Sequence, residues 1–170
     1  TLGSMARVDS TPKGLRPHAM PQSLSADYLH VVFSTKERRA WFADTGQQAP
    51  LHEYIGAISR ELDCPPVQVG GVADHIHVLA RCGREASQAG LVKEIKRVSP
   101  RWLNTQGEPS RDFEWQRGHA IFSVSPSNLD RVRAHVAEQR KHHAKFDYQR
   151  ELRTPLQRHG LDWDENHLWD

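Results

Sequence analysis

The sequence predicts an α+β domain of the ferredoxin-like, split β-α-β type, in which an antiparallel sheet carries helices on one face. Two observations predict this class. Four short segments have the alternation or the β-branched and aromatic enrichment of strands, and two longer segments have the 3.6-residue apolar spacing of helices. Their order along the chain is β-α-β-β-α-β, which is the split β-α-β order.

The first half of this pattern is a strand, a helix and a second strand. Residues 28–34 are rich in β-branched and aromatic side chains and predict a strand. Apolar residues follow the helical period from about 49 to 62. Pro65 and Pro66 come next and cannot continue a helix, so the helix must end before them. Residues 67–71 predict the second strand.

The second half repeats the alternation of strands and helices. A strand centred on His75 and His77 runs to about residue 81, and a helix carries Leu91 to Trp102. Residues 119–125 predict the fourth strand. A third, long helix then starts near Pro126 and ends near His143, and we expect this C-terminal-side helix to carry site residues. A short helix at about 149–159 follows.

Length and composition indicate one globular domain over residues 22–170. The chain has 170 residues, of which 26 % are charged and 37 % hydrophobic, as in folded rather than disordered proteins. Residues 1–21 mix Gly, Pro, Ser and basic residues without periodicity, so we expect a flexible leader whose first five residues are a cloning remnant. Two cysteines without CxxC spacing favour a reducing cytoplasm. No apolar run approaches the roughly 18 residues that span a membrane.

His75 and His77 are the first candidate site residues. They are two apart on a strand, so both imidazoles project from the same face, while Ile76 and Val78 project from the other. Two neutral imidazoles can hold one divalent metal ion. The simpler alternative is a pair of half-exposed strand histidines.

Gln139 and His135 are candidates on the third helix. A helix packed on the sheet can bring Gln139 over the histidines, and its carbonyl oxygen suits a hard ion such as Mg²⁺ or Mn²⁺. His135 lies four residues earlier, on the same helix face. It could be a nucleophile, an acid or base, or an extra ligand. For both residues, a solvated helix position is the simpler interpretation.

Basic residues form a stripe along the second helix. Lys93, Lys96, Arg97 and Arg101 follow the helical period, with Glu94 as the one acidic residue among them. Such a stripe can follow a phosphate backbone, although a solvated face is the alternative. The following residues extend the basic surface: Arg111, Arg117, Arg131, Arg133, Arg140 and Lys141. We therefore predict DNA contact, with Arg117 added to the helix residues.

The ordered series of motifs resembles the HUH single-tyrosine transposases of small insertion sequences, including their repeat-associated relatives. His-x-His alone is a weak signal, but the whole series in this order is a strong one. The resemblance covers roughly residues 22–170. The matching stretches are residues 28–36, 71–79, 91–96, 115–118, 122–125, 138–139, 142–143 and 164–170.

The resemblance implies a metal-assisted reaction on single-stranded DNA. In that family two histidines and a helix glutamine bind Mg²⁺ or Mn²⁺, and these roles carry over to His75, His77 and Gln139. A tyrosine one helical turn before the glutamine attacks a phosphodiester and forms a 5′-phosphotyrosine, so strand joining needs no ATP. The enzymes are homodimers that recognise hairpins, and their tyrosine helix can serve the partner subunit's metal.

The chain departs from this pattern at the nucleophile, because the family's tyrosine position falls on His135. An imidazole can form a phosphoramidate, but not the phosphotyrosine that the family's chemistry requires. The change is a loss in an inactive copy, a substitution introduced when the protein was made, or a true change of nucleophile. Three functions remain: a transposase-like protein in which cleavage is lost or altered, a non-cleaving hairpin-DNA binding module, and a metal-dependent nuclease with His135 as general base.

Overall fold

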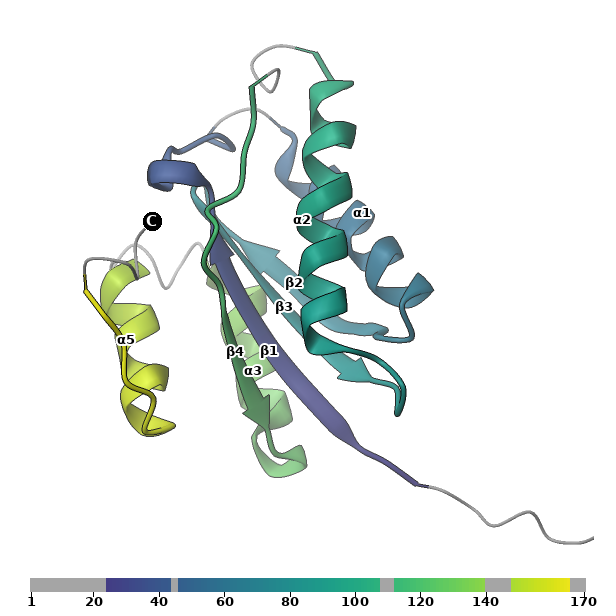
Figure 1. Cartoon of the computed structure of the whole chain (residues 1–170), viewed down its shortest axis with the longest axis vertical. Helices are drawn as coiled ribbons and strands as arrows, with labels where there is room; N and C mark the ends of the chain where they lie inside the picture. Colours follow the sequence, from purple (N-terminus) through teal and green to yellow (C-terminus); the bar gives the residue numbers. More distant parts are fainter. Residues whose placement is uncertain (1–23, 44–45, 108–111, 140–147, 166–170) are drawn as a thin grey trace, which may run out of the picture.

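Four strands form one antiparallel sheet in the order β2-β3-β1-β4 in the computed structural model of the chain (Figure 1). The strands are β1 (Asp27–Ser34), β2 (Pro66–Gly71), β3 (His75–Cys82) and β4 (Ala120–Val124). The structure describes residues 24–43, 46–107, 112–139 and 148–165, so the predicted leader lies outside the described residues. The α+β class is confirmed, and the strand order is consistent with the ferredoxin-like arrangement.

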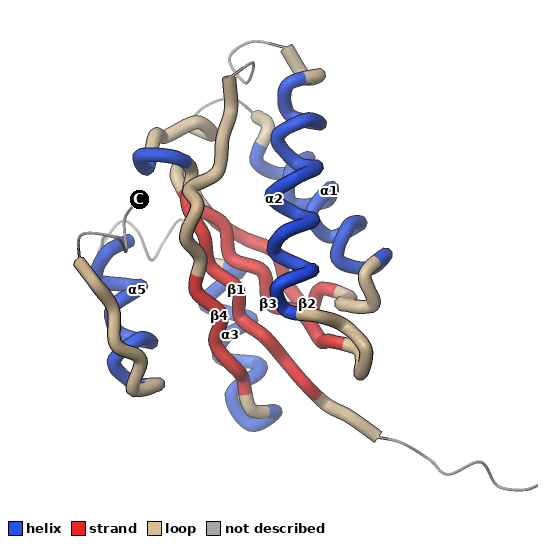
Figure 2. The backbone as a smooth tube through the Cα atoms, in the orientation of Figure 1, coloured by secondary structure: helices blue, strands red, loops and turns tan. Residues whose placement is uncertain are grey.

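The helices lie on both faces of this sheet (Figure 2). They are α1 (Gln48–Glu61), α2 (Gln88–Asn104), α3 (Leu129–Ala137) and α5 (Tyr148–Arg158), with short 3₁₀ turns η1 (Lys36–Arg38) and η2 (Pro126–Asn128). Helices α1 and α2 pack against each other on one face, as predicted. Helix α3 packs against β2 and β3 from the other face, where Figure 1 draws it behind the sheet.

Alternation along the strands separates the main core from a polar face. On the first face Val31, Phe33, Ile76 and Val78 are fully buried in the core that α1 and α2 complete. The residues between them point to the second face. There a smaller apolar cluster joins the sheet to α5, and it consists of Val32, Ala120, Phe122, Tyr148, Leu152 and Leu156. The polar residues of the second face lie beside this cluster.

Gly70 on β2 allows α3 to lie directly against the sheet. Gly70 pairs with His77 across the β2–β3 ladder. A Cβ atom at Gly70 would lie 2.0 Å from the carbonyl oxygen of Val136 on α3, which is far inside van der Waals contact. The missing side chain therefore places the backbone of α3 over the strand that carries the candidate histidines.

The third helix is shorter than predicted within the described residues. Helix α3 ends at Ala137, and Glu138 leaves the helical conformation with φ −100° and ψ 22°. Gln139 follows this break, so His135 is on α3 whereas Gln139 is just beyond its C-terminal end. The predicted end near His143 lies outside the described residues. Among the helices in the described ranges, none is long and apolar enough to cross a lipid bilayer.

Candidate active site

His75 and His77 project together from the second face of the sheet. Both side chains are buried, with 0 % and 1 % exposure, and their ring centroids are 5.0 Å apart. They lie on the central strand β3, whose alternation sends Ile76 and Val78 into the main core. The two imidazoles therefore share one buried polar region.

Each of these imidazoles is held through its Nδ1 atom. Nδ1 of His75 lies 2.7 Å from Oδ1 of Asp74, whose other carboxylate oxygen is 3.3 Å from the Arg38 guanidinium. Nδ1 of His77 lies 2.8 Å from Nε2 of His30 on β1. A carboxylate can only accept, so His75 carries its proton on Nδ1 and presents the Nε2 lone pair to the second face.

Burial favours the neutral forms of His77 and His30. Burial, with help from neighbouring His75 and His30, holds the pKa of His77 well below its ordinary value. Burial likewise lowers the pKa of His30 to about 4. For Asp74, burial alone would raise the pKa, but the hydrogen bond from His75 and the charge of Arg38 outweigh it and lower the pKa. The neutral imidazole is the form that binds metal ions.

Gln139 reaches the imidazole pair from the end of α3. Its buried side chain places Oε1 at 3.4 Å from Nε2 of His75. Its Nε2 donates to Oε1 of Glu151 at 2.9 Å, which directs the amide oxygen toward His75. The structure thus brings together the three side chains that the sequence analysis proposed as metal ligands.

Glu151 on α5 is a site residue that the sequence analysis missed. Its side chain is 8 % exposed, and its Oε1 and Oε2 lie 3.6 Å from Nε2 of His77 and 3.8 Å from Nε2 of His75. One donor atom from each of these three residues falls within 4.8 Å of the others. The local sequence around Glu151 is an ordinary polar helix, so no pattern marks it.

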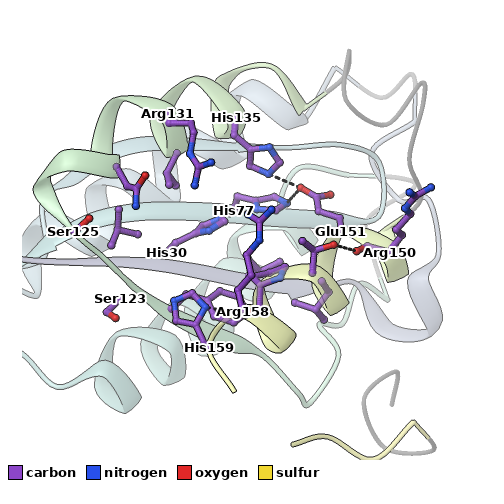
Figure 3. Close-up of a pocket in the computed structure, with 18 of the residues that line it drawn as sticks. His30, His77, Ser123, Ser125, Arg131, His135, Arg150, Glu151, Arg158 and His159 are labelled. Carbon is purple, nitrogen blue, oxygen red and sulfur yellow. Dashed lines mark hydrogen bonds and ion pairs between the residues drawn. The ribbon is translucent and has the colours of Figure 1, made fainter. Parts of the chain in front are cut away.

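His135 lies beside Glu151 rather than against the imidazole pair. Its Nε2 is 2.6 Å from Oε1 of Glu151 and 3.1 Å from Nε2 of Gln139 (Figure 3). The His135 ring centroid is 5.8 Å from that of His77. With 30 % exposure, its side chain lies where the buried site opens to solvent.

Tyr148 also forms part of the site, although the sequence analysis gave it no role. Its ring centroid is 4.6 Å from that of His75, and its hydroxyl hydrogen-bonds to Ser34. Burial raises the pKa of this phenol, which disfavours the phenolate that a nucleophile needs. Tyr148 therefore packs against His75 and does not replace the missing tyrosine at position 135.

The donor atoms suit a divalent metal ion. Nε2 of His77 is buried and, within the described parts of the chain, has no hydrogen-bond partner. Nε2 of His75 lies 3.4 Å from Oε1 of Gln139 and 3.8 Å from Oε2 of Glu151, so several atoms with lone pairs converge on one region. A cation among these atoms would satisfy all of them at once. The residues present therefore fit a metal centre.

A model of the IS200-like transposase family matches residues 23–139, which is more than half of the chain. The chain belongs to this transposase family. Two solved structures share the fold of this family member. One is an inferred transposase from Deinococcus radiodurans R1, with a TM-score of 0.55 and 17 % identity over 69 % of this chain and 93 % of that one.

The second is a REP-associated tyrosine transposase bound to a REP hairpin. Its TM-score is 0.51, with 15 % identity over 74 % of this chain and 72 % of that one. No curated protein sequence matches the chain.

A cavity of about 630 Å³ lies beside the candidate metal ligands of this transposase-family chain and is lined by residues of α3 and α5. His77, His135 and Glu151 lie in its wall. Arg131 of α3 and Arg158 of α5 line the same cavity, and Figure 3 shows both among the labelled residues around it. The surroundings of the centre are therefore cationic, as a site for a phosphate backbone requires.

The basic residues of α2 lie apart from this cavity, because α2 packs on the first face of the sheet. Nζ of Lys96 donates to three backbone oxygens, those of residues 116, 117 and 118, and burial lowers its pKa to about 8. Arg97 forms a two-point ion pair with Glu94. Lys93, Arg101 and Arg117 are exposed. Arg111, Arg140 and Lys141 lie outside the described residues.

Proposed function

We propose that this transposase-family chain binds single-stranded or hairpin DNA and holds one phosphodiester at the metal centre of its second sheet face. The observation that supports the proposal is the convergence of His75, His77 and Gln139. Of these, His77 also lines a cavity whose wall carries arginines. The hairpin-bound relative with the same fold supports hairpin DNA as the ligand.

The proposed ion is divalent, with Mg²⁺ or Mn²⁺ as the family implies. When bound, it would polarise the phosphodiester and balance charge on the leaving oxygen. The chain's own residues do the rest. Asp74 and His30 hold the two imidazoles through their Nδ1 atoms, and the arginines of the cavity bind the phosphate backbone.

His135 determines whether strand cleavage occurs and how. Oε1 of Glu151 lies 2.6 Å from Nε2 of His135, so the carboxylate can accept a hydrogen bond from a proton on Nε2. This hydrogen bond would make the other ring nitrogen of His135, Nδ1, a stronger base. This contact favours a second candidate function, a nuclease in which His135 removes a proton from an attacking water. If His135 neither attacks the DNA nor activates a water molecule, the protein is a non-cleaving hairpin-DNA binding module.

One experiment separates these functions. The protein is incubated with labelled hairpin DNA and Mn²⁺, and the DNA is examined for a nick and for a covalent protein–DNA adduct. An adduct supports covalent transfer by His135, a nick without an adduct supports water attack, and tight binding without either supports the binding module. Absence of DNA binding would refute the proposal.

The variant His135→Tyr tests whether only the nucleophile differs from the family pattern. We expect it to form a phosphotyrosine adduct on single-stranded DNA. The matched control is His159→Tyr, which introduces the same side chain in the same cavity but away from Gln139. If His135→Tyr remains without an adduct while it still binds metal and DNA, the family mechanism does not apply to this chain.

Two features of the proposal concern assembly and location. We propose a homodimer, in which α3 of one subunit can serve the metal centre of its partner, and light scattering of the purified protein tests its mass. We also propose action on DNA in the cytoplasm, in keeping with two free cysteines.

A further inference from the structure

The end of β1 links the segment before β4 to the strand that carries the histidine pair. The backbone N–H of Gln116 donates to the carbonyl oxygen of Ser34 at 3.0 Å, and the N–H of Thr35 donates to that of Asp74 at 2.8 Å. Ser34 and Thr35 are fully buried. The position of Gln116 is therefore coupled through two hydrogen bonds to Asp74, which holds the His75 imidazole.

Side chains make a second connection along the same path. The Ser34 hydroxyl donates to Oε1 of Gln116 and, with its one proton used, accepts from the Tyr148 hydroxyl. The Tyr148 ring lies 4.6 Å from His75, centroid to centroid. All four side chains are at least nine-tenths buried. Each link is hard to break, because a buried polar group without its partner is costly.

Lys96 holds the outer end of this path from α2, on the first face of the sheet. Its Nζ donates to the backbone oxygens of residues 116, 117 and 118 at 2.9, 3.1 and 2.5 Å. An ammonium group has three protons, so these bonds use all of them. Nζ also lies over the Phe33 ring, 5.1 Å from its centroid. One charge thus fixes three consecutive peptides that belong to no helix or strand.

We propose that Lys96 is a positioning residue for the metal centre, which acts through the 116–118 segment and Ser34 to hold His75 in place. The inference rests on the metal centre of the proposed function and leaves its ligands unchanged. Hydrogen bonds behind a ligating histidine orient its ring, and their loss costs roughly 10–100-fold in metal affinity. A substitution on one face of the sheet should therefore be felt at the site on the other face.

The test is calorimetry of Mn²⁺ binding by the full chain, without DNA, after chelation and dialysis. The site counted is the one that is lost in His77→Ala. Lys96→Met removes the three donors but keeps an unbranched side chain, and Ser34→Ala breaks the path at its middle with a smaller change in volume. Lys93→Met is the matched control, because it makes the same substitution at an exposed position of α2. If Lys96→Met does not fold, Lys96→Gln takes its place.

We expect Lys96→Met and Ser34→Ala each to weaken Mn²⁺ binding by about 10-fold, and Lys93→Met to leave it unchanged. Because both residues act on one path, the double variant should lose much less than the roughly 100-fold product of two independent effects. Leu51→Ala leaves a cavity in the main core, so it should lower the melting temperature without a change in Mn²⁺ affinity. This variant separates a loss of stability from a loss of position.

A readout without metal reports on the imidazole itself. The Nδ1–H proton of His75 is buried and lies against Asp74, so proton NMR of the metal-free chain should detect it, and its absence in His75→Gln identifies the signal. Lys96→Met should shift this resonance, whereas Leu51→Ala should leave it in place.

Three results would overturn the inference, and they differ in what else they remove. If Lys96→Met and Ser34→Ala bind Mn²⁺ as the wild type does, Lys96 has no positioning role and the proposed function stands. Losses that multiply in the double variant would show two separate effects and would refute the shared path alone. If His77→Ala itself leaves Mn²⁺ binding unchanged, the metal centre and the proposed function both fail.

Discussion

Replacing Gly70 with alanine tests whether contact between β2 and α3 holds the candidate site together. The new Cβ would lie 2.0 Å from the carbonyl oxygen of Val136 and 3.0 Å from its Cγ1. A carbon and a carbonyl oxygen normally approach to about 3.3 Å, so α3 must move by roughly 1.3 Å. Neither flexible side chains nor solvent can absorb this shift, because the nearest atom belongs to backbone.

We expect Gly70→Ala to destabilise the protein by about 3 kcal/mol, the upper end of the range for overpacked cores. At about 2–4 °C per kcal/mol for a chain of this size, the melting temperature should fall by roughly 6–12 °C. Circular dichroism during thermal unfolding measures the change.

Gly56→Ala is the matched control. It introduces the same methyl group on α1, where the nearest atom would be Cγ of Pro66 at 3.5 Å, an ordinary contact. Alanine is the better helix former, so this variant should be unchanged or more stable by up to about 1 kcal/mol. If Gly70→Ala melts within 2 °C of the wild type, on the order expected for less than 1 kcal/mol, α3 does not depend on this close approach.

Three further predictions concern stability and DNA binding. Folding lowers the pKa of His30 from 6.5 to about 4, so as the pH falls the unfolded metal-free chain takes up a proton on this residue before the folded chain does. The contribution of His30 to the free energy of unfolding is therefore complete above pH 6.5 and falls by about 3 kcal/mol toward pH 4, as urea titrations at different pH would measure. His30→Asn should flatten this pH profile. Ser99→Ala removes the acceptor of the buried Trp115 indole N–H, 2.8 Å away, and should lower the urea-derived stability by about 1–3 kcal/mol, whereas an unchanged value would refute the role of this bond. Arg131→Ala with Arg158→Ala should weaken hairpin-DNA binding and reduce the salt slope by about 0.7 per lost phosphate contact, and an unchanged slope would place the DNA elsewhere.

The strands, their order and the position of the histidine pair could be predicted because each depends on local pattern. Strand β3 alternates, so His75 and His77 had to share a face opposite Ile76 and Val78. The position of Gln139 was harder, since it required α3 to pack over that face. It lies there even though the helix breaks at Glu138, because Gly70 lets the backbone approach.

Glu151 could not be predicted, because nothing in a polar helix shows which of its carboxylates is buried. Its role depends on how α5 docks on the sheet through Leu152 and Leu156, a long-range contact without a sequence signature. Lys96 illustrates the same limit. The helical period places it in a basic stripe, but its ammonium donates to backbone oxygens of residues 116–118, 20–22 positions away. Its role in DNA binding stays a prediction, as do those of Lys93, Arg97, Arg101 and Arg117.

The division of the sheet into an apolar face and a polar face has a consequence for how this chain tolerates change. Folding depends mainly on the layer between the sheet and the helix pair α1 and α2, which no candidate ligand enters. On α3, whose nine residues are all described, Val136 is the one that is buried, and its neighbour His135 is partly open to solvent. We therefore expect exchange of the side chain at position 135 to leave the scaffold intact, so that new chemistry can be introduced there without loss of the folded protein.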